Sequence, residues 1–497
     1  MSKSKKSTKE FDLFSVSLST KARQTISHLL ERKEKLKLEN QKLQDERQGQ
    51  KDVKDDQNDC VQQDLPLKNI INSDRYKFSS RFLYWFKLLS KFLSVQLIVQ
   101  ILGFASGILI IRTLSKEDYA YFAIANSLQG MMNLLADSGI SIGLTSIGGK
   151  VWQDKYRFGQ LINTAMHLRR YLAIVSITVV TPILLWMLIN SGASIPYAIT
   201  ITLVILSELY FYLINGVLGI VPRLHSQIKI IQNLDLVFSG SRLVLLCIAY
   251  FTFLNAAIAA LISTIASGLQ SFLIRRWIKG TIDTKADISI EYKKNIVKII
   301  KSQYLIAVYS CVQGQIPLLL LSLFGNTENI AEFGALGRLG IIFTIINSVM
   351  TSIVLPSFAR CQSSRLLYRR YCQIILLNCI LGFVLVGCTG IFSTQLLSIL
   401  GEKYNGLHWE LTTITFSIIF GHIGGTMWAL NSTKGWIKYA WLYPPTTIVT
   451  QILLLFAVNV STLRGVLISS IISMIPSFMI NIMLSYKGLR ESSKVNI

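Results

Sequence analysis

The sequence predicts an all-α polytopic membrane protein with about 12 transmembrane helices, arranged as two six-helix halves. The 497-residue chain is 51% hydrophobic. From about residue 92 onward, apolar runs of roughly 20 residues alternate with short polar links, and runs of that length cross a bilayer. Two segments 211 residues apart resemble each other. The longest polar interval of this part, 275–303, is too short for a soluble domain.

The first 80 residues predict a polar cytoplasmic tail, because no apolar signal-peptide core follows the basic start. Leucines at 29, 36 and 43 recur every seven residues, as in a short coiled coil. Lys33 and Asn40 at core positions would weaken it, so a solvated, partly disordered or briefly helical tail is favoured. Residues 81–91 mix aromatic and basic side chains, which is typical of an interfacial amphipathic helix.

Apolar length, glycine and proline positions and charge predict the individual spans. They are expected near 92–114, 119–137, 171–190, 196–220, 234–253, 256–274, 304–324, 330–355, 371–392, 410–430, 438–459 and 465–485. Proline removes a helix hydrogen bond, so bends are expected in the third, seventh, eleventh and twelfth spans. The prolines concerned are Pro182, Pro317, Pro444, Pro445 and Pro476.

The distribution of basic residues predicts the orientation. Loops after the even-numbered spans hold 21 Lys and Arg, against 4 in the opposite loops, so both termini are expected in the cytoplasm. This places an N-terminal half at 92–275, a cytoplasmic linker at 276–303, a C-terminal half at 304–486 and a short cytoplasmic tail at 487–497. The net charge of +23 is thus explained by membrane orientation, and no nucleic-acid partner is expected.

An internal repeat relates the two halves. Residues 117–128 (EDYAYFAIANSL) align with 328–339 (ENIAEFGALGRL), with four identities in twelve positions. Both segments open the even-numbered member of a span pair, and six spans per half make the repeats parallel. Ser115 followed by Asp118 predicts a helix N-cap at the first of these segments.

The stretch IIRTLSKEDYAYFAIANSLQGMMNLLADSGIS resembles the opening of Wzx-type polysaccharide flippases, a family of the multidrug/oligosaccharidyl-lipid/polysaccharide (MOP) exporter superfamily. Its Arg-x-Leu-x-x-Glu-Asp-Tyr element and the later Asp-Ser-Gly-Ile carry the resemblance. Residues 334–360 are similar to that family's eighth span, and the resemblance covers about 400 residues. The 80-residue tail is a departure from the family pattern.

The resemblance implies a V-shaped bundle of twelve helices around a cationic cavity, located in a bacterial inner membrane. It implies transport of undecaprenyl-diphosphate-linked oligosaccharides by alternating access, for O-antigen, capsule or exopolysaccharide. Membrane lipids, a polysaccharide polymerase and chain-length machinery are the partners to expect.

Ionisable residues inside the spans are the candidate site residues, since each costs about 3 kcal/mol in a bilayer. Arg338, between Gly337 and Gly340, could bind a diphosphate through its fork of donors. The structural alternative is a pair with Glu332, or with Asp137 across the bundle.

Arg242 in the fifth span is the second candidate ligand of the anion. Asp235 lies seven residues earlier on the same face, so an ion pair between them is an equal alternative.

Glu208, near the middle of the fourth span, could couple transport to protons or cations, or could be a paired structural acid. Asp137 is expected at the interface. His422 is expected to be a hydrogen-bonded packing residue rather than a proton relay.

Patterns of enzymes are missing from the sequence. It contains no nucleotide-binding GxxxxGK[ST] motif and no metal-spaced His/Cys set, so no enzyme activity, cofactor or metal is expected. Two other functions remain open. One is a cation-coupled antiporter of small molecules or drugs, as in MATE transporters, and the other is a membrane scaffold for polysaccharide enzymes.

Overall fold

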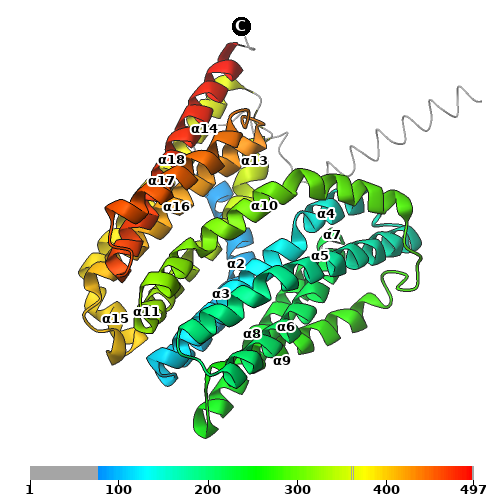
Figure 1. Cartoon of the computed structure of the whole chain (residues 1–497). Coiled ribbons are helices and arrows are strands. Elements are labelled where there is room, and N and C mark those ends of the chain that lie inside the picture. The colour runs from blue at the N-terminus through cyan, green and yellow to red at the C-terminus, as the bar shows by residue number, and fades with distance from the viewer. Residues whose placement is uncertain (1–76, 226, 360, 362, 495–497) are drawn as a thin grey trace, which may run out of the picture. The chain divides into compact units, whose positions relative to one another are not determined.

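The computed structural model describes residues 77–225, 227–359, 361 and 363–494, and every regular element in these ranges is a helix (Figure 1). The predicted tail 1–80, with its possible coiled coil, lies almost entirely outside the described residues. The chain divides into two compact units, 1–88 and 89–497. The second unit includes the residues of both halves predicted from the sequence.

The N-terminal half contains eight helices. They are α2 (Lys77–Thr113), α3 (Lys116–Asp137), α4 (Ile140–Val151), α5 (Lys155–Asn190), α6 (Ile195–Leu218), α7 (Ile220–Leu224), α8 (Ile228–Thr252) and α9 (Ala256–Ile278). The expected N-cap is present, because the Ser115 side chain accepts a hydrogen bond from the Asp118 amide at 3.0 Å. The short α4 and α7 were not predicted.

The C-terminal half begins with α10 (Ile290–Phe324). It continues with α11 (Thr327–Gly337), η1 (Arg338–Ile341), α12 (Ile342–Val349), η2 (Met350–Val354), α13 (Leu355–Ala359), α14 (Ser364–Ile391), α15 (Ser393–Leu400), η3 (Glu402–Tyr404), α16 (His408–Thr433), η4 (Ala440–Leu442), α17 (Tyr443–Ala457) and α18 (Leu463–Lys494). Helix α10 starts inside the predicted linker 276–303, and α18 extends into the predicted tail 487–497.

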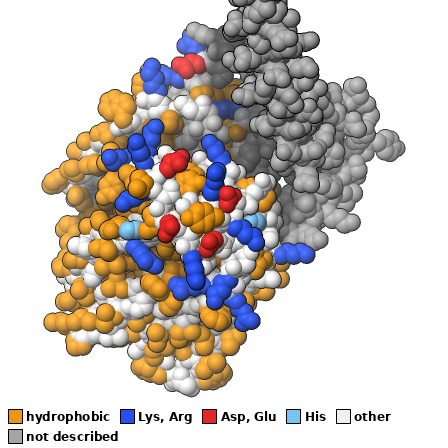
Figure 2. All heavy atoms as spheres, turned by 90° about the vertical axis from the view of Figure 1, so that its right-hand side faces the viewer, with side chains coloured by type: hydrophobic (Ala, Val, Ile, Leu, Met, Phe, Trp, Pro, Cys, Tyr) orange, Lys and Arg blue, Asp and Glu red, His pale blue; other side chains and the backbone are white. Residues whose placement is uncertain are grey.

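Ten helices of the described chain are long and apolar enough to cross a membrane, so this is a multi-pass membrane protein. Figure 2 shows the matching surface: charged side chains gather in one zone of the face, and hydrophobic side chains cover much of the remainder. The prediction of an all-α polytopic protein is confirmed, and ten candidate spans are roughly consistent with the predicted number of about 12.

The two predicted spans that fail this test are the second and the eighth. The second, α3, crosses the interior of the bundle and packs on α5, α6, α10 and α11, so it can carry polar residues such as Asn126, Gln129 and Asn133. The eighth is not the continuous helix predicted for 330–355. It breaks after Gly337 into a 3-10 turn at Arg338 and contains a π segment from Met350. Glycine at 337 and 340 favours this break because it destabilises helix interiors.

The prolines act in two different ways. Pro182, Pro317 and Pro476 lie inside α5, α10 and α18, where each removes a backbone donor. The bend predicted for the eleventh span at Pro444 and Pro445 is wrong, because these residues occupy the first turn of α17. Amides of a first turn have no intrahelical partner, so proline starts this helix without cost.

Polar contacts join the two halves at the end of the bundle that carries the α2–α3 turn. The Arg112 guanidinium donates to the carbonyl oxygens of Ser398 and Ile399, at 2.6 and 3.0 Å. In return, the Lys403 ammonium donates to the carbonyl of Leu114 at 2.7 Å. Arg112 and Lys403 therefore form hydrogen bonds between the two halves.

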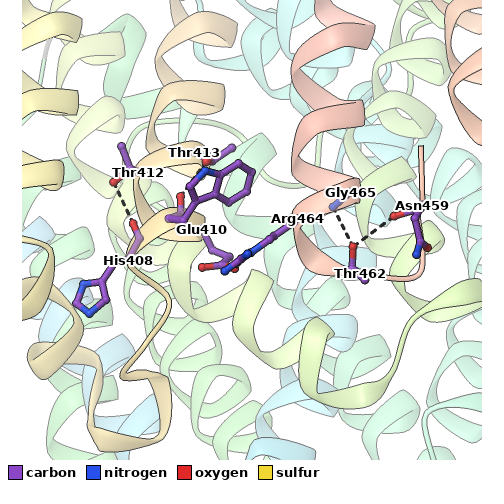
Figure 3. A network of polar contacts seen from close by, with 9 residues as sticks. His408, Glu410, Thr412, Thr413, Asn459, Thr462, Arg464 and Gly465 are labelled. Atoms are coloured by element: carbon purple, nitrogen blue, oxygen red, sulfur yellow. Dashed lines mark hydrogen bonds and ion pairs between the residues drawn. The ribbon is translucent and has the colours of Figure 1, made fainter. Parts of the chain in front are cut away.

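Within the C-terminal half, Arg464 at the start of α18 forms an ion pair with Glu410 at the start of α16, where the two side chains point toward each other (Figure 3). Its guanidinium also lies 5.5 Å from the centre of the Trp409 ring. The pair fixes α16 and α18 side by side, since the Glu410 side chain is buried.

Candidate functional site

A cavity of about 560 Å³ lies inside the N-terminal half, among α3, α6, α8 and α9. Three of the residues selected from the sequence line it: Glu208, Asp235 and Arg242. The expectation that Asp235 and Arg242 share a face of one helix therefore agrees with the geometry. The size is in the range of small-molecule sites.

Glu208 on α6 has two polar neighbours in this cavity. Its carboxylate interacts with the side-chain amide of the buried Gln129 on α3 and with the positive charge of Arg242 on α8. The amide of Gln129 and the charge of Arg242 stabilise the ionised carboxylate, and whether Glu208 is a structural or a coupling acid stays a prediction. A proton or cation that reached the cavity would neutralise the Glu208 carboxylate and so weaken its attraction to Gln129 and Arg242.

Asp235 has different partners from the one the sequence suggested. Gln270 on α9 donates to its Oδ1 at 3.2 Å, and its neighbouring positive charge is that of Arg223. Asp235 and Arg242 form no ion pair in the described part of the chain. Arg242 is thus left with Glu208 as its acidic neighbour, and its Nε is buried without a hydrogen-bond partner there.

Arg338 lies at the break of the eighth span and reaches the N-terminal half. Its side chain packs over Gly107 of α2, its guanidinium lies 5.8 Å from the Phe122 ring centre, and Tyr119 is a polar neighbour. Among the described residues, Arg338 forms neither of the predicted ion pairs, with Glu332 or with Asp137. Glu332 is engaged by Lys116 instead.

The guanidinium groups of Arg242 and Arg338 act on each other as like charges. They come from opposite halves, and Glu208 offsets the charge of Arg242. Two like charges at membrane depth with one carboxylate beside them are costly, so this arrangement favours a bound anion. Two guanidinium forks suit the four or more oxygens of a diphosphate.

Asp137 is paired with Arg169 of α5 at 3.4 Å, and accepts a hydrogen bond from Ser141 at 2.6 Å. Arg169 precedes the predicted third span and is one of the 21 basic residues that the sequence assigns to loops, and this assignment is wrong. It lies within a continuous helix that starts at Lys155, and it is buried with Nε and Nη1 unpartnered in the described residues. Gly216 makes room for it, since a Cβ there would lie 2.3 Å from Nη1.

His422 on α16 lies apart from these groups, in the C-terminal half. One ring nitrogen is 3.0 Å from Oδ1 of Asn378, and the ring packs 5.3 Å from that of Phe343. This is the environment expected of a hydrogen-bonded packing residue.

Sequence reasoning missed the uncharged part of the site. Side-chain amides of Asn126, Gln129 and Asn133 line the cavity from α3, and those of Asn215 and Gln270 line it from α6 and α9. The signal was the spacing of the polar residues in α3, which recur every three or four positions up to Asp137 and so share one helix face. No metal-like group of three His, Cys, Asp or Glu residues occurs in the described ranges.

Comparisons with known proteins identify the fold. No protein-family model matches the sequence, and no curated protein matches it. Among solved structures, one similar chain is described as the inward-facing conformation of a multidrug resistance MATE family transporter of the MOP superfamily. It has a TM-score of 0.66 at 18% identity, over 80% of this chain and 96% of that one.

Two further structures are similar. One, described as an outward-facing conformation of such a MATE transporter, has a TM-score of 0.55 at 17% identity and covers 81% of this chain and 94% of that one. The other is a MOP superfamily transporter from Pyrococcus furiosus, whose reverse polarity of binding pocket is said to suggest a different function. Its TM-score is 0.59 at 18% identity, over 82% of this chain and 95% of that one. The chain therefore has the fold of MOP-superfamily transporters.

Proposed function

We propose that this protein is a flippase that moves oligosaccharides linked to a polyprenyl diphosphate across a bacterial inner membrane, with both termini in the cytoplasm. The observation that carries the proposal is the pair of guanidinium groups, Arg242 and Arg338, which come from opposite halves and repel each other as like charges, while Glu208 offsets the charge of Arg242. A diphosphate would neutralise the excess positive charge and link the two halves.

Alternating access follows from the same placement. A ligand held by one residue from each half is released to one side or the other as the halves separate at opposite ends. In this structure, polar contacts such as Lys403 with the Leu114 carbonyl hold one end together. The higher similarity to an inward-facing transporter supports assigning that end to the outside of the cell.

The test replaces Arg242 and Arg338 with Ala in a strain whose own copy of this gene is deleted. Each change is expected to remove polymer from the cell surface while leaving the amount of protein in the membrane unchanged. One charge-assisted contact contributes about 2 kcal/mol, so the purified variants should bind a short-chain prenyl diphosphate roughly 30-fold more weakly. Arg276→Ala, at an exposed arginine outside the cavity, is the matched control. Normal surface polymer in both site variants would contradict the proposal.

A second candidate function is a cation-coupled antiporter of drugs or small molecules. It is favoured by the two carboxylates, Glu208 and Asp235, that line one cavity, and by the MATE descriptions of the structural neighbours. Vesicles containing the protein would then expel a cationic dye in exchange for protons or sodium. Arg338→Ala would leave that exchange intact or raise it, because it removes a repelling charge.

A further inference from the structure

A series of hydrogen bonds fixes the side-chain amides of Asn215 and Gln270 in the cavity of the N-terminal half. Ser271 donates to Oδ1 of Asn215 at 2.7 Å, and Asn215 donates to Oε1 of Gln270 at 3.1 Å. Gln270 in turn donates to Oδ1 of Asp235 at 3.2 Å. The series crosses α9, α6 and α8, so these groups are held in one orientation before any ligand binds.

Apart from Nε of Arg242, the groups of this cavity that can bind a ligand include several acceptors. Oδ1 of Asn133 is buried and has no partner in the described residues. The hydrogen bond from Gln270 occupies Oδ1 of Asp235, so Oδ2 is available to accept a hydrogen bond from a ligand. Glu208 adds a second carboxylate to the cavity. A buried acceptor without a donor is costly, so the cavity is suited to a ligand rich in O–H or N–H donors.

We propose that this amide-lined region binds the sugar attached directly to the diphosphate, and that it selects neutral or amino sugars over acidic ones. The inference rests on the proposed function, since Arg242 lies in the same cavity and would hold the neighbouring phosphate. Hydroxyl groups of a sugar donate to Asn133 and Asp235. When a diphosphate occupies Arg242, Glu208 and Asp235 outnumber the remaining cation, Arg223, and repel a sugar carboxylate.

The experiment measures binding of three short-chain prenyl diphosphates to the full-length protein in nanodiscs. The first has no sugar, the second carries one N-acetylhexosamine, and the third carries one uronic acid. The wild-type protein is expected to bind the second at least tenfold more tightly than the first, and the third no more tightly than the first.

Two variants test the assigned residues. Asn133→Leu should weaken binding of the second ligand about tenfold and leave the first unchanged. Asn233→Leu, at an exposed asparagine of α8 outside the cavity, is the matched control. Asp235→Asn keeps the side-chain shape and should improve binding of the uronic acid ligand, so it gives an independent answer if Asn133→Leu fails to fold.

The outcomes separate the two proposals. If the sugar-free diphosphate does not bind the wild-type protein, the proposed function is overturned. If all three ligands bind it equally, or if Asn133→Leu weakens the first and second ligands to the same degree, the sugar site is overturned while the flippase proposal stands. If the cavity holds only water and no sugar, the three ligands are expected to bind equally.

Discussion

Ala123 of α3 and Gly334 of α11, which the 211-residue repeat makes equivalent, face each other between the two halves. A Cβ added at Gly334 would lie 2.8 Å from that of Ala123 and 3.5 Å from the Tyr119 ring. Equivalent residues of parallel repeats meet only close to the axis that relates them. The close approach of α3 and α11 at this point is possible because position 334 has no side chain.

A larger residue at Gly334 should force α3 and α11 apart. We expect Gly334→Val to lower the free energy of unfolding by about 1–3 kcal/mol, since overpacking a tight contact has that cost. Thermal unfolding of the detergent-purified protein measures it. Gly337→Val is the control in the same helix, where a Cβ would meet nothing within 4 Å. Equal destabilisation by both substitutions would show that helix propensity alone is responsible.

Lys116 should help to hold the two halves together at this end. Its ammonium forms ion pairs with Glu328 and with Glu332, the latter at 3.4 Å. Burial alone would lower the pKa of Lys116, but the two carboxylates outweigh burial and raise it. While the two carboxylates are ionised, the contribution of the ammonium to stability is therefore complete below the ordinary lysine pKa of about 10.4 and is lost as the pH rises through the raised value.

A double-mutant cycle with Lys116→Met and Glu332→Gln should give a coupling of about 1 kcal/mol at pH 7, because the pair is only partly buried. Thiol labelling of a cysteine placed beside the pair should become faster in each single variant, as this end opens more often. A coupling near zero, with unchanged labelling, would mean that the pair does not hold the halves together.

The all-α, multi-pass architecture could be predicted from the sequence because the length and spacing of apolar runs are local patterns. The break at Arg338 could not, since glycine is common in membrane helices and only packing decides whether a helix continues. The hydrogen-bond partners of the charged residues could not be predicted from the sequence either. Asp235 is two turns from Arg242, yet Gln270, a residue of another helix, occupies its oxygen. Arg169 was misplaced because a charged residue near an apolar run is normally assigned to a loop.

Arg169 should be essential for stability. Asp137→Asn would leave a buried cation without its counter-charge, which costs about 3–5 kcal/mol. Gly216→Ala should act in the same direction, because its Cβ would lie 2.3 Å from Nη1 of Arg169. The control is Arg157→Met, which removes an exposed ion pair with Asp154 and should change the free energy of unfolding by less than about 1 kcal/mol. An equally mild Asp137→Asn would show that water replaces the carboxylate.

Gly107 should control where the Arg338 guanidinium lies. A Cβ at position 107 would be 3.7 Å from Cδ of Arg338, so alanine fits there and a leucine side chain does not. Gly107→Leu should displace the guanidinium from Arg242 and weaken binding of a short-chain prenyl diphosphate about tenfold, although no charge is altered. Gly103→Leu is the control one turn earlier on α2, where a Cβ meets nothing within 4 Å. Unchanged affinity in Gly107→Leu would mean that Arg338 does not need its present position to bind the anion, and the two-arginine site would have to be abandoned.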